Sequence, residues 1–419
     1  MKLLIGGSPC THWSIAQTKN RETEASGIGW ELFLNYRIAR DKSKPDFFLY
    51  ENNKSMSPTI RAQITAELGV EPALINSALV SAQNRQRLYW VGKRNPDGTY
   101  SQVAVEQPED RGILLRDILE TGVAWSEKSY CITATEAKGS NPQQTLTKHR
   151  RTMVAEPIVV NGMKNGKART VDAHMGKLEN NLVPRINNPN QAKQQYDCIA
   201  EPVRIGTIES KAKNTDFDSQ QYRVYSPDGK SVTLCGNGGG VGAKTGLYAV
   251  PVIPDGKGQF VIKAAGRKEI PVYEVRGGRI TIRGKEYPIK LADGFYIIRK
   301  LTVTECKRLQ TVPDTYAFPV SDTQAYKMLG NGWTVDVIAH IMSHFDGLTA
   351  GPVEVLSMYD GMSCGHIALD KLGAEITAYY ATEIDKYAIQ TTQHNFPDTV
   401  QLGDAFQVRD DDWRLGDKL

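Results

Sequence analysis

The sequence lacks the features of a membrane or secreted protein. No apolar run approaches transmembrane length, and the opening MKLLIGGSPC has too short an apolar run for a signal peptide. The six cysteines have no CxxC spacing and therefore indicate neither a zinc site nor a disulfide framework. We expect a cytoplasmic protein with free thiols, no bound metal and no membrane contact.

The sequence also lacks a large excess of either charge. It has 51 Lys and Arg and 47 Asp and Glu, which gives a net charge of +4. This total says little about partners, because a nucleic-acid-binding protein concentrates its basic residues locally. One local cluster lies among threonines and asparagines: Lys148, Arg150, Arg151, Lys164, Lys167 and Arg169. Taken alone, the cluster fits a solvated surface better than a binding site.

The 419 residues suffice for two or three domains, and the sequence pattern changes twice. Residues 1–98 alternate apolar strands with helical spacing, which predicts a parallel, doubly wound α/β sheet. Residues 99–298 are rich in Gly, Asn, Gln and Lys, with short β-type runs and a glycine-dense stretch at 236–242. Residues 299–419 return to alternating strands and helices.

Several individual elements are predicted within this frame. Residues 11–29 have no clear period and are expected to form a mobile loop. The expected strands cover residues 2–5, 45–50, 73–80, 88–91, 353–358 and 376–381, and the expected helices cover residues 30–39, 59–68, 302–312 and 335–345.

The turn Gly6-Gly7-Ser8-Pro9-Cys10 follows the first expected strand. Pro9 fixes its own φ and biases Ser8 away from the helical region, while the glycines supply the freedom that a tight turn needs. This turn places the Cys10 thiol at the carboxyl edge of the sheet, where α/β enzymes position their chemistry. For an isolated Pro-Cys pair, a buried structural cysteine is the better interpretation.

Glu51, Arg85 and Arg87 also lie near expected strand ends, so they can converge with Cys10 on one edge of the sheet. A thiol of ordinary pKa, about 8.5, is mostly protonated at neutral pH, and arginine charges lower that value. A carboxyl group can exchange hydrogen bonds with a heterocycle nitrogen. The set suits covalent attack on an electron-poor ring, with a structural Glu51–Arg87 ion pair as the alternative.

A second constellation follows the strand at 353–358. A glycine turn there lets the backbone approach a ligand closely, and Glu383 lies where an acid can accept hydrogen bonds from ribose hydroxyls. Asp404, after a third strand, can accept from an adenine amine. The spacing is not GxGxxG, which favours S-adenosylmethionine over a nicotinamide dinucleotide.

These motifs together resemble the cytosine-C5 DNA methyltransferases. Pro9-Cys10, Glu51-Asn52-Asn53 and Gln83-x-Arg85-x-Arg87 are similar to the family's catalytic motifs, with Asn53 in place of a valine. Residues 299–310 and Gly330-Asn331-Gly332 resemble its last motifs, and Tyr359-Asp360-Gly361, Glu383 and Asp404 resemble its cofactor motifs. The resemblance covers both flanks, about half of the chain, and the middle region matches no motif.

The order of the motifs departs from the family. The cofactor motifs normally come first, but here they come last, which is the order of a circular permutation. The resemblance implies a Rossmann-like methyltransferase sheet, permuted, with an inserted β-rich target-recognition domain. Residues 1–98 are then the catalytic half, residues 99–298 the target-recognition domain, and residues 299–419 the cofactor-binding half.

The resemblance also implies a mechanism and a set of site residues. The enzyme flips a cytosine out of duplex DNA, Cys10 attacks C6, Glu51 holds N3 and the exocyclic amine, and C5 takes a methyl group from S-adenosylmethionine. The expected cofactor residues are Asn331, Trp333, Tyr359, Asp360, Gly361, Met362, Gly365, Glu383, Ile384 and Asp404. The expected DNA contacts are Ser14, Gln83, Lys148, Arg150 and Arg151, and we expect a monomer in a restriction-modification setting.

Other functions remain open at this point. An RNA cytosine methyltransferase would use the same chemistry, although a middle region of roughly two hundred residues suits a duplex-reading domain. A DNA-binding protein that has lost catalysis, or one half of a modification complex, is a second alternative, and a nicotinamide dehydrogenase is a third. Asn53, Ser363 and Cys364 also raise the hypothesis that the pocket accepts a modified S-adenosylmethionine.

Overall fold

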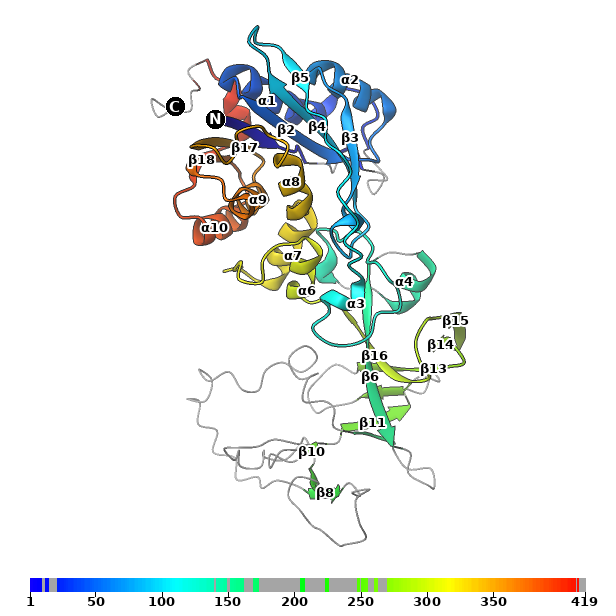
Figure 1. Ribbon diagram of the computed structural model, residues 1–419. Coiled ribbons are helices and arrows are strands. Elements are labelled where there is room, and N and C mark those ends of the chain that lie inside the picture. Colours follow the sequence, from blue (N-terminus) through cyan, green and yellow to red (C-terminus); the bar gives the residue numbers. More distant parts are fainter. Residues whose placement is uncertain are drawn as a thin grey trace. The chain divides into compact units, whose positions relative to one another are not determined.

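The computed structural model (Figure 1) forms two compact units. Unit 1 comprises Met1–Ile118, Glu127–Gly139 and Val303–Leu419, and unit 2 comprises Leu119–Ser126 and Ser140–Thr302. The structure describes residues 1–9, 12–14, 21–138, 141–148, 151–161, 169–172, 204–207, 223–225, 247–248, 250–254, 260–262, 270–411 and 413. Among these residues, none of the helices is long and apolar enough to cross a membrane.

Unit 1 is built on an eight-stranded sheet in the order β19-β18-β17-β1-β2-β4-β3, with β5 paired to β4. The neighbours from β19 to β2 are all parallel. The strands are β1 (Lys2–Gly6), β2 (Phe47–Asn53), β3 (Pro72–Asn76), β4 (Gln86–Arg94), β5 (Tyr100–Gln102), β17 (Val353–Met358), β18 (Ile376–Thr382) and β19 (Val400–Gly403).

The expectation of an entirely parallel sheet is wrong at one edge. Strand β4 runs antiparallel to both β2 and β3. Only residues 77–85 join β3 to β4, which is too short for the crossover that a parallel connection needs. The predicted strand over residues 73–80 likewise ends at Asn76, and a 3₁₀ turn, η2 (Ser77–Leu79), takes its place.

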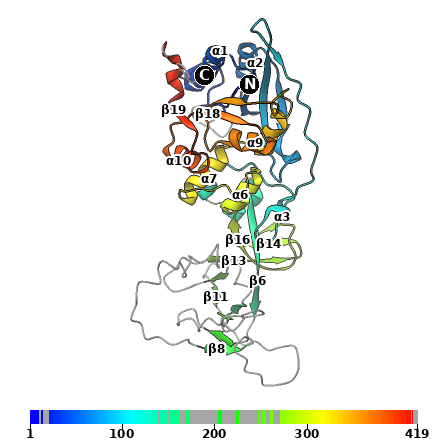
Figure 2. The same cartoon turned by 60° about the vertical axis from the view of Figure 1, so that its left-hand side comes forward.

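Helices cover both faces of this sheet (Figure 1; Figure 2), with α1 and α2 on one face and α9 and α10 on the other. Their bounds are α1 (Gly27–Ser43), α2 (Pro58–Leu68), α9 (Cys364–Leu372) and α10 (Lys386–Asn395). Local signals fix their ends: the Ser57 side chain caps α2 ahead of Pro58, and Gly69 ends it at φ 75°. Because α1 begins at Gly27, the loop predicted over residues 11–29 is too long by three residues.

The core of unit 1 is rich in aromatic side chains between α1 and the sheet. Phe33, Tyr36, Tyr50 and Trp90 are all fully buried. Each such side chain stabilises the fold by roughly 2–3 kcal/mol through its buried apolar area. The Tyr36 hydroxyl donates 2.9 Å to the carbonyl of Leu49, which satisfies its polar end and ties the helix to β2.

Further helices of unit 1 lie in the segments around residues 115–138, 303–342 and 405–409. They are α3 (Leu115–Ile118), η3 (Glu136–Lys138), α6 (Val303–Leu309), α7 (Asp322–Asn331), α8 (Val335–Met342) and η6 (Ala405–Arg409). The helix expected over residues 302–312 ends at Leu309, and Thr311 adopts φ 53°, which a continuing helix excludes.

Unit 2 is dominated by antiparallel strands. The order β12-β11-β7-β6-β16-β13 closes on itself through a β12–β13 pairing, and the hairpin β14–β15 extends from β13. Their bounds are β6 (Met153–Asn161), β7 (Arg169–Asp172), β11 (Val250–Pro254), β12 (Phe260–Ile262), β13 (Ile270–Arg276), β14 (Arg279–Ile282), β15 (Lys285–Pro288) and β16 (Gly294–Lys300). Among the residues that the structure describes, each strand of this ring therefore has a paired neighbour on either side.

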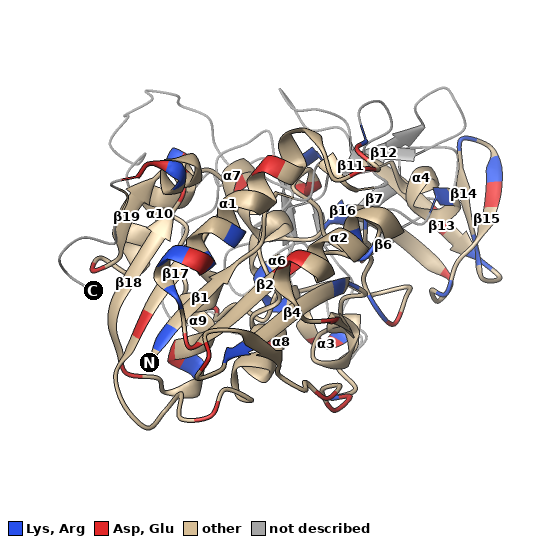
Figure 3. Ribbon diagram, turned by 90° about the horizontal axis from the view of Figure 1, so that it is seen from above, with Lys and Arg blue, Asp and Glu red and all other residues tan. Residues whose placement is uncertain are grey.

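Unit 2 also holds a small sheet and a helix: β8 (Arg204–Thr207), β9 (Arg223–Tyr225), β10 (Leu247–Tyr248) and α4 (Pro142–Lys148). Charges of both signs lie together on the hairpin β14–β15 (Figure 3), where Arg279 Nε stands 2.7 Å from Glu286 Oε2. The glycine-dense stretch at 236–242 lies outside the described residues.

Candidate active site

The centre of the unit 1 sheet is a topological switch point. From β17 the chain winds through α9 toward β18, and from β1 it winds through α1 toward β2, on the opposite side. The two strands are parallel neighbours, with Gly6 opposite Met358. Loops that leave the carboxyl ends of such strands diverge, and α/β proteins bind ligands in the resulting crevice.

The turn after β1 is fastened to β2 beside Glu51. The Ser8 and Tyr50 hydroxyls lie 2.7 Å apart, and the Asn52 amide donates 3.1 Å to the carbonyl of Ser8. A Cβ atom at Gly7 would lie 2.7 Å from the carbonyl oxygen of Glu51, so only glycine fits there. Cys10, the predicted nucleophile, lies outside the described residues, one position after Pro9.

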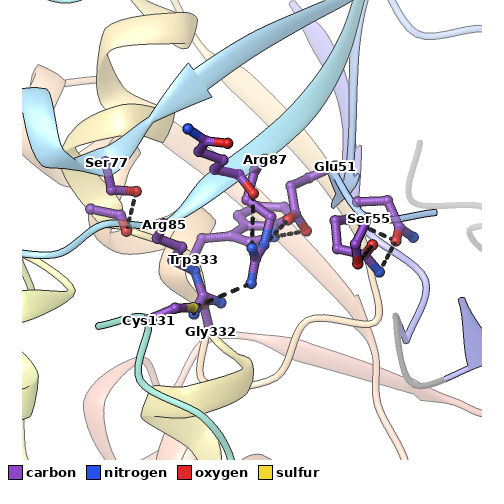
Figure 4. A network of polar contacts seen from close by, with 12 residues as sticks. Glu51, Ser55, Ser77, Arg85, Arg87, Cys131, Gly332 and Trp333 are labelled. Atoms are coloured by element: carbon purple, nitrogen blue, oxygen red, sulfur yellow. Dashed lines mark hydrogen bonds and ion pairs between the residues drawn. The ribbon is translucent and has the colours of Figure 1, made fainter. Parts of the chain in front are cut away.

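The carboxylate of Glu51 is held on both of its oxygens (Figure 4). Arg87 Nε, from β4, pairs with Oε1 at 3.0 Å, and the indole nitrogen of Trp333 donates 2.9 Å to Oε2. The Glu51 and Arg87 side chains are only 12% and 15% exposed. The sequence placed Glu51 and Arg87 at one edge of the sheet and offered an ion pair between them as the alternative to a catalytic role, and that ion pair is present. Trp333 was placed with the cofactor residues.

Arg85 has a different environment from Arg87, although two positions separate them. It is 4% exposed, and its guanidinium donates to the carbonyls of Ile132, Gly330 and Gly332 at 3.2, 3.3 and 2.8 Å. These bonds hold two loops together inside the protein. The structure therefore gives Arg85 a supporting position, with both of its terminal nitrogens hydrogen-bonded inside unit 1.

The loop after β17 meets the end of β18 through Glu383. The Glu383 carboxylate accepts from the backbone N–H of Gly361 at 2.8 Å, and from those of Ile384 and Asp385 at 2.7 and 2.8 Å. Ile384 is 73% exposed beside it. Tyr359 and Gly361 both have φ 61°, a strained conformation for tyrosine that is typical of ligand-binding loops.

The other expected cofactor residues divide into two groups. Met362 is buried, Gly365 packs against Ile5, and the Asp360 carboxylate accepts from the Tyr379 hydroxyl at 2.8 Å, so these three support the loop from within the fold. Burial raises the pKa of Asp360, and the hydrogen bonds to its carboxylate offset part of this rise. Asp404 and Asn331 are exposed, and Asp404 also caps η6 by accepting from the N–H of Phe406.

Comparison with known proteins decides the family. The model of the C-5 cytosine-specific DNA methylases matches residues 1–241 and 259–346. The chain belongs to this family. Its activity is that of a DNA (cytosine-5-)-methyltransferase, as the motifs predicted.

Named relatives agree with this assignment. The chain is 26% identical over 340 residues to the orphan methyltransferase M.SPBetaI of Bacillus phage SPbeta, covering 74% of this chain and 68% of that one. It is 24% identical over 390 residues to the orphan methyltransferase M.SPRI of Bacillus phage SPR, covering 81% of each. The type II methyltransferase M.HhaI of Haemophilus parahaemolyticus is 30% identical over 122 residues, 29% of this chain and 24% of that one.

Gln83 lies inside unit 1 of this methyltransferase. It is fully buried, its amide donates to the carbonyl of Leu309 and to the Gln310 side chain, and its oxygen accepts from the N–H of Ile132 at 2.8 Å. Every polar atom of this side chain is hydrogen-bonded inside unit 1, so this arrangement does not support the expected DNA contact. In the Gln-x-Arg-x-Arg motif, Arg87 is the arginine that pairs with the Glu51 carboxylate.

Cys131 is a site residue that sequence reasoning missed. Its sulfur accepts from Arg85 at 3.3 Å and from Arg87 at 3.9 Å. Burial raises the pKa of the Cys131 thiol. The charges and hydrogen bonds of Arg85 and Arg87 lower it by more in total, so the pKa lies below its ordinary value. No spacing in the sequence linked residue 131 to the catalytic motifs.

The remaining DNA-binding candidates fall in two places. Ser14 is partly exposed near the base of the loop after β1, where the buried Trp13 donates 3.2 Å to Glu22. Lys148 is exposed at the end of α4, and Arg151 is partly exposed before β6. Arg150 lies outside the described residues.

Proposed function

We propose that this methyltransferase uses Cys10 as its nucleophile, Glu51 and Arg87 as the groups that hold the flipped cytosine, and S-adenosylmethionine as the methyl donor. The observation that carries the proposal is the Glu51 carboxylate, which is anchored beside Gly7 in the turn after β1, three positions before Cys10. A carboxyl group held in this way can pair with N3 and the exocyclic amine of cytosine in one fixed plane.

The residues around Gly361 fit a nucleoside-bearing sulfonium such as S-adenosylmethionine. Nothing lies within 4 Å of where a Cβ of Gly361 would stand, so the loop faces open space. The partly exposed Glu383 carboxylate and the exposed Ile384 side chain offer a ribose acceptor and an apolar contact for a base. S-adenosylmethionine, when bound there, supplies the methyl group that C5 of the cytosine receives.

The protein's own groups carry the remaining steps. The Cys10 thiolate forms a bond to C6, and the ring electrons shift toward C5 and N3, which takes a proton from the protonated form of Glu51 and returns it when the ring becomes aromatic again. Arg87 balances the charge that Glu51 carries after giving up this proton and keeps the carboxyl in place. After C5 is substituted, a water-borne base removes the C5 proton, the C6–S bond breaks and aromaticity returns.

Trapping on a 5-fluorocytosine duplex tests this proposal. Fluorine at C5 blocks the final proton removal, so we expect a denaturation-resistant adduct with the unaltered protein and S-adenosylmethionine. The Cys10→Ala variant should bind the duplex but form no adduct. An adduct that persists in Cys10→Ala would refute the assigned nucleophile, and sequencing of trapped duplexes would give the target.

We also propose that the chain is a circular permutant. If β17, β18 and β19 are counted first and β1, β2, β3 and β4 next, the sheet reads 3-2-1-4-5-7-6, so each half winds outward from the centre. The family match ends at residue 346, before the cofactor strands. Residues near both chain ends contact the segment between α1 and β2, since Lys42 donates to the carbonyl of Asp410 and Asp46 accepts from the N–H of Lys2.

A rearranged gene tests the permutation. Residues 353–419 would be placed before Met1 through a short glycine linker, with new ends in the exposed loop at 347–351. We expect the rearranged protein to fold and to form the same 5-fluorocytosine adduct. A folded, DNA-binding product without adduct formation would show that the chain order is part of the working site.

Finally, we propose that unit 2, residues 119–126 and 140–302, reads the target sequence, the role expected for residues 99–298. Its closed β ring with Lys148 and Arg151 supports this role. If both residues contact phosphates, replacing either by alanine should lower the slope of log K against log salt by about 1. Lys93→Ala, whose ammonium pairs with Asp346 in unit 1, serves as the matched control and should leave the slope unchanged.

A further inference from the structure

We propose that Trp333 is a positioning residue that orients the catalytic carboxyl of Glu51, a role that rests on the proposed function of Glu51. The two oxygens of Glu51 are bound by donors from separate elements, Arg87 in β4 and Trp333 between α7 and α8. One anchor on each oxygen fixes the plane of the carboxyl group, which a single anchor leaves free to rotate.

The backbone on both sides of Trp333 is held firmly. The carbonyl of Gly332 accepts from Arg85 at 2.8 Å and from the Gln310 amide at 3.1 Å. On the other side, the Thr334 hydroxyl donates 2.8 Å to the Gln310 side chain. The indole therefore reaches Glu51 from a rigid base, as a precise catalytic arrangement needs.

The chemistry of the indole N–H suits this position. Glu51 has to hold the proton that it shares with the ring during attack at C6, and a second cation on its other oxygen would disfavour this protonated form. A neutral donor such as indole fixes the geometry without adding charge. An oxygen of a carboxylate has more than one acceptor direction, so Oε1 and Oε2 each keep one for the cytosine.

Glycine at position 7 completes the enclosure of this carboxyl. A Cβ there would stand 2.9 Å from Glu51 Oε2, the oxygen that Trp333 binds. Any larger residue would push Oε2 away from the indole. The turn, the indole and the guanidinium of Arg87 thus confine Glu51 from three directions.

A nuclear magnetic resonance measurement tests the contact itself. The six tryptophans give six indole N–H signals in a 15N-tryptophan-labelled protein, and the signal missing from Trp333→Phe belongs to Trp333. We expect Glu51→Gln to shift this signal and to leave the signal of Trp90, whose indole donates to Thr65 at 3.0 Å, in place. An unmoved Trp333 signal would overturn the proposal.

Kinetics on the 5-fluorocytosine duplex test its consequence. Trp333→Phe keeps an aromatic ring but loses the N–H, so adduct formation at saturating S-adenosylmethionine should slow by roughly tenfold, the effect of one hydrogen bond to a charged group. The affinity for S-adenosylmethionine should stay within about twofold. Trp90→Phe, the matched loss of an indole N–H, should leave the rate unchanged.

The outcomes separate the two proposals. An unchanged rate with weaker S-adenosylmethionine binding would assign Trp333 to the cofactor and refute the positioning role. A Glu51→Gln variant that forms adduct at the unaltered rate would refute the proposed function of Glu51. If Glu51→Gln forms the adduct slowly and Trp333→Phe forms it at the unaltered rate, the positioning role of Trp333 is refuted and the proposed function of Glu51 stands.

Discussion

Replacing Arg85 by alanine should destabilise unit 1 more than it alters contact with substrate. The guanidinium is 4% exposed and serves the carbonyls of Ile132, Gly330 and Gly332. Without it, three buried carbonyls lose a charged donor, at about 1 kcal/mol each, although Gly332 keeps the Gln310 amide, so the free energy of unfolding should fall by about 2–3 kcal/mol. Screening by solvent is slight at this depth, so no large discount applies.

Arg87→Ala provides the contrast. Its side chain is more exposed, at 15%, and its charge faces Glu51 at 3.0 Å, so its loss should reduce the adduct rate far more than stability. The free energy of unfolding of Arg85→Lys should lie between those of the unaltered protein and Arg85→Ala. A lysine ammonium can donate to some of the same carbonyls but lacks the planar fork of arginine.

Urea unfolding followed by tryptophan fluorescence measures this difference, since five of the six tryptophans lie in unit 1: Trp13, Trp30, Trp90, Trp333 and Trp413. The expected result is a clearly lower midpoint for Arg85→Ala and a nearly unaltered one for Arg87→Ala. If Arg85→Ala unfolded at the unaltered midpoint but formed no adduct, Arg85 would act on the substrate and the reasoning from its carbonyl contacts would be refuted.

Two further predictions concern the surroundings of this cluster. Because the pKa of Cys131 is lowered, its alkylation by iodoacetamide should rise with pH earlier than that of an ordinary thiol, and Arg87→Ala should move the rise to higher pH. Cys364, whose pKa burial raises to about 12, should stay unmodified, and peptide mapping after timed alkylation checks both sites. Gly330→Ala places a Cβ 2.1 Å from the backbone of the neighbouring loop, so it should lower the free energy of unfolding by about 2 kcal/mol or more. Gly351→Ala is the control: its Cβ would have nothing within 4 Å, so the urea midpoint should stay unchanged. Equal midpoints for the two glycine variants would contradict the close packing at Gly330.

Local patterns in the sequence predicted most of the α/β unit. The apolar run at 353–358 coincides with β17, and Pro58 with Gly69 bounds α2 as capping rules require. Period and capping depend on neighbours along the chain, which is why these elements could be read without a structure. The antiparallel β4 was missed because strand direction follows from connection length, which the predicted strand over 73–80 obscured.

The site was predictable only where a motif marks it. Glu51 and Arg87 were placed together correctly because both stand at strand ends of one sheet. Motif spacing could not separate Arg85 from Arg87: alternate residues of a strand share a face, and only long-range partners decide their roles. The contact between Trp333 and Glu51 could not be predicted for the same reason, since the two residues lie 282 positions apart in the sequence.

The chain order has a physical consequence for when this site forms. The central pair of the unit 1 sheet joins residues 2–6 to residues 354–358, the widest separation in the sheet. Until β17 is present, β1 has an unpaired edge, and the loop after β17 has no partner at the switch point. Strand β2 and Arg87 need only the first part of the chain, but Trp333 and the loop at Gly361 come from the last part. The carboxyl of Glu51 therefore gains its second anchor only late along the chain, close to where β17 begins, so orientation of this carboxyl and assembly of the predicted cofactor edge are coupled by the fold.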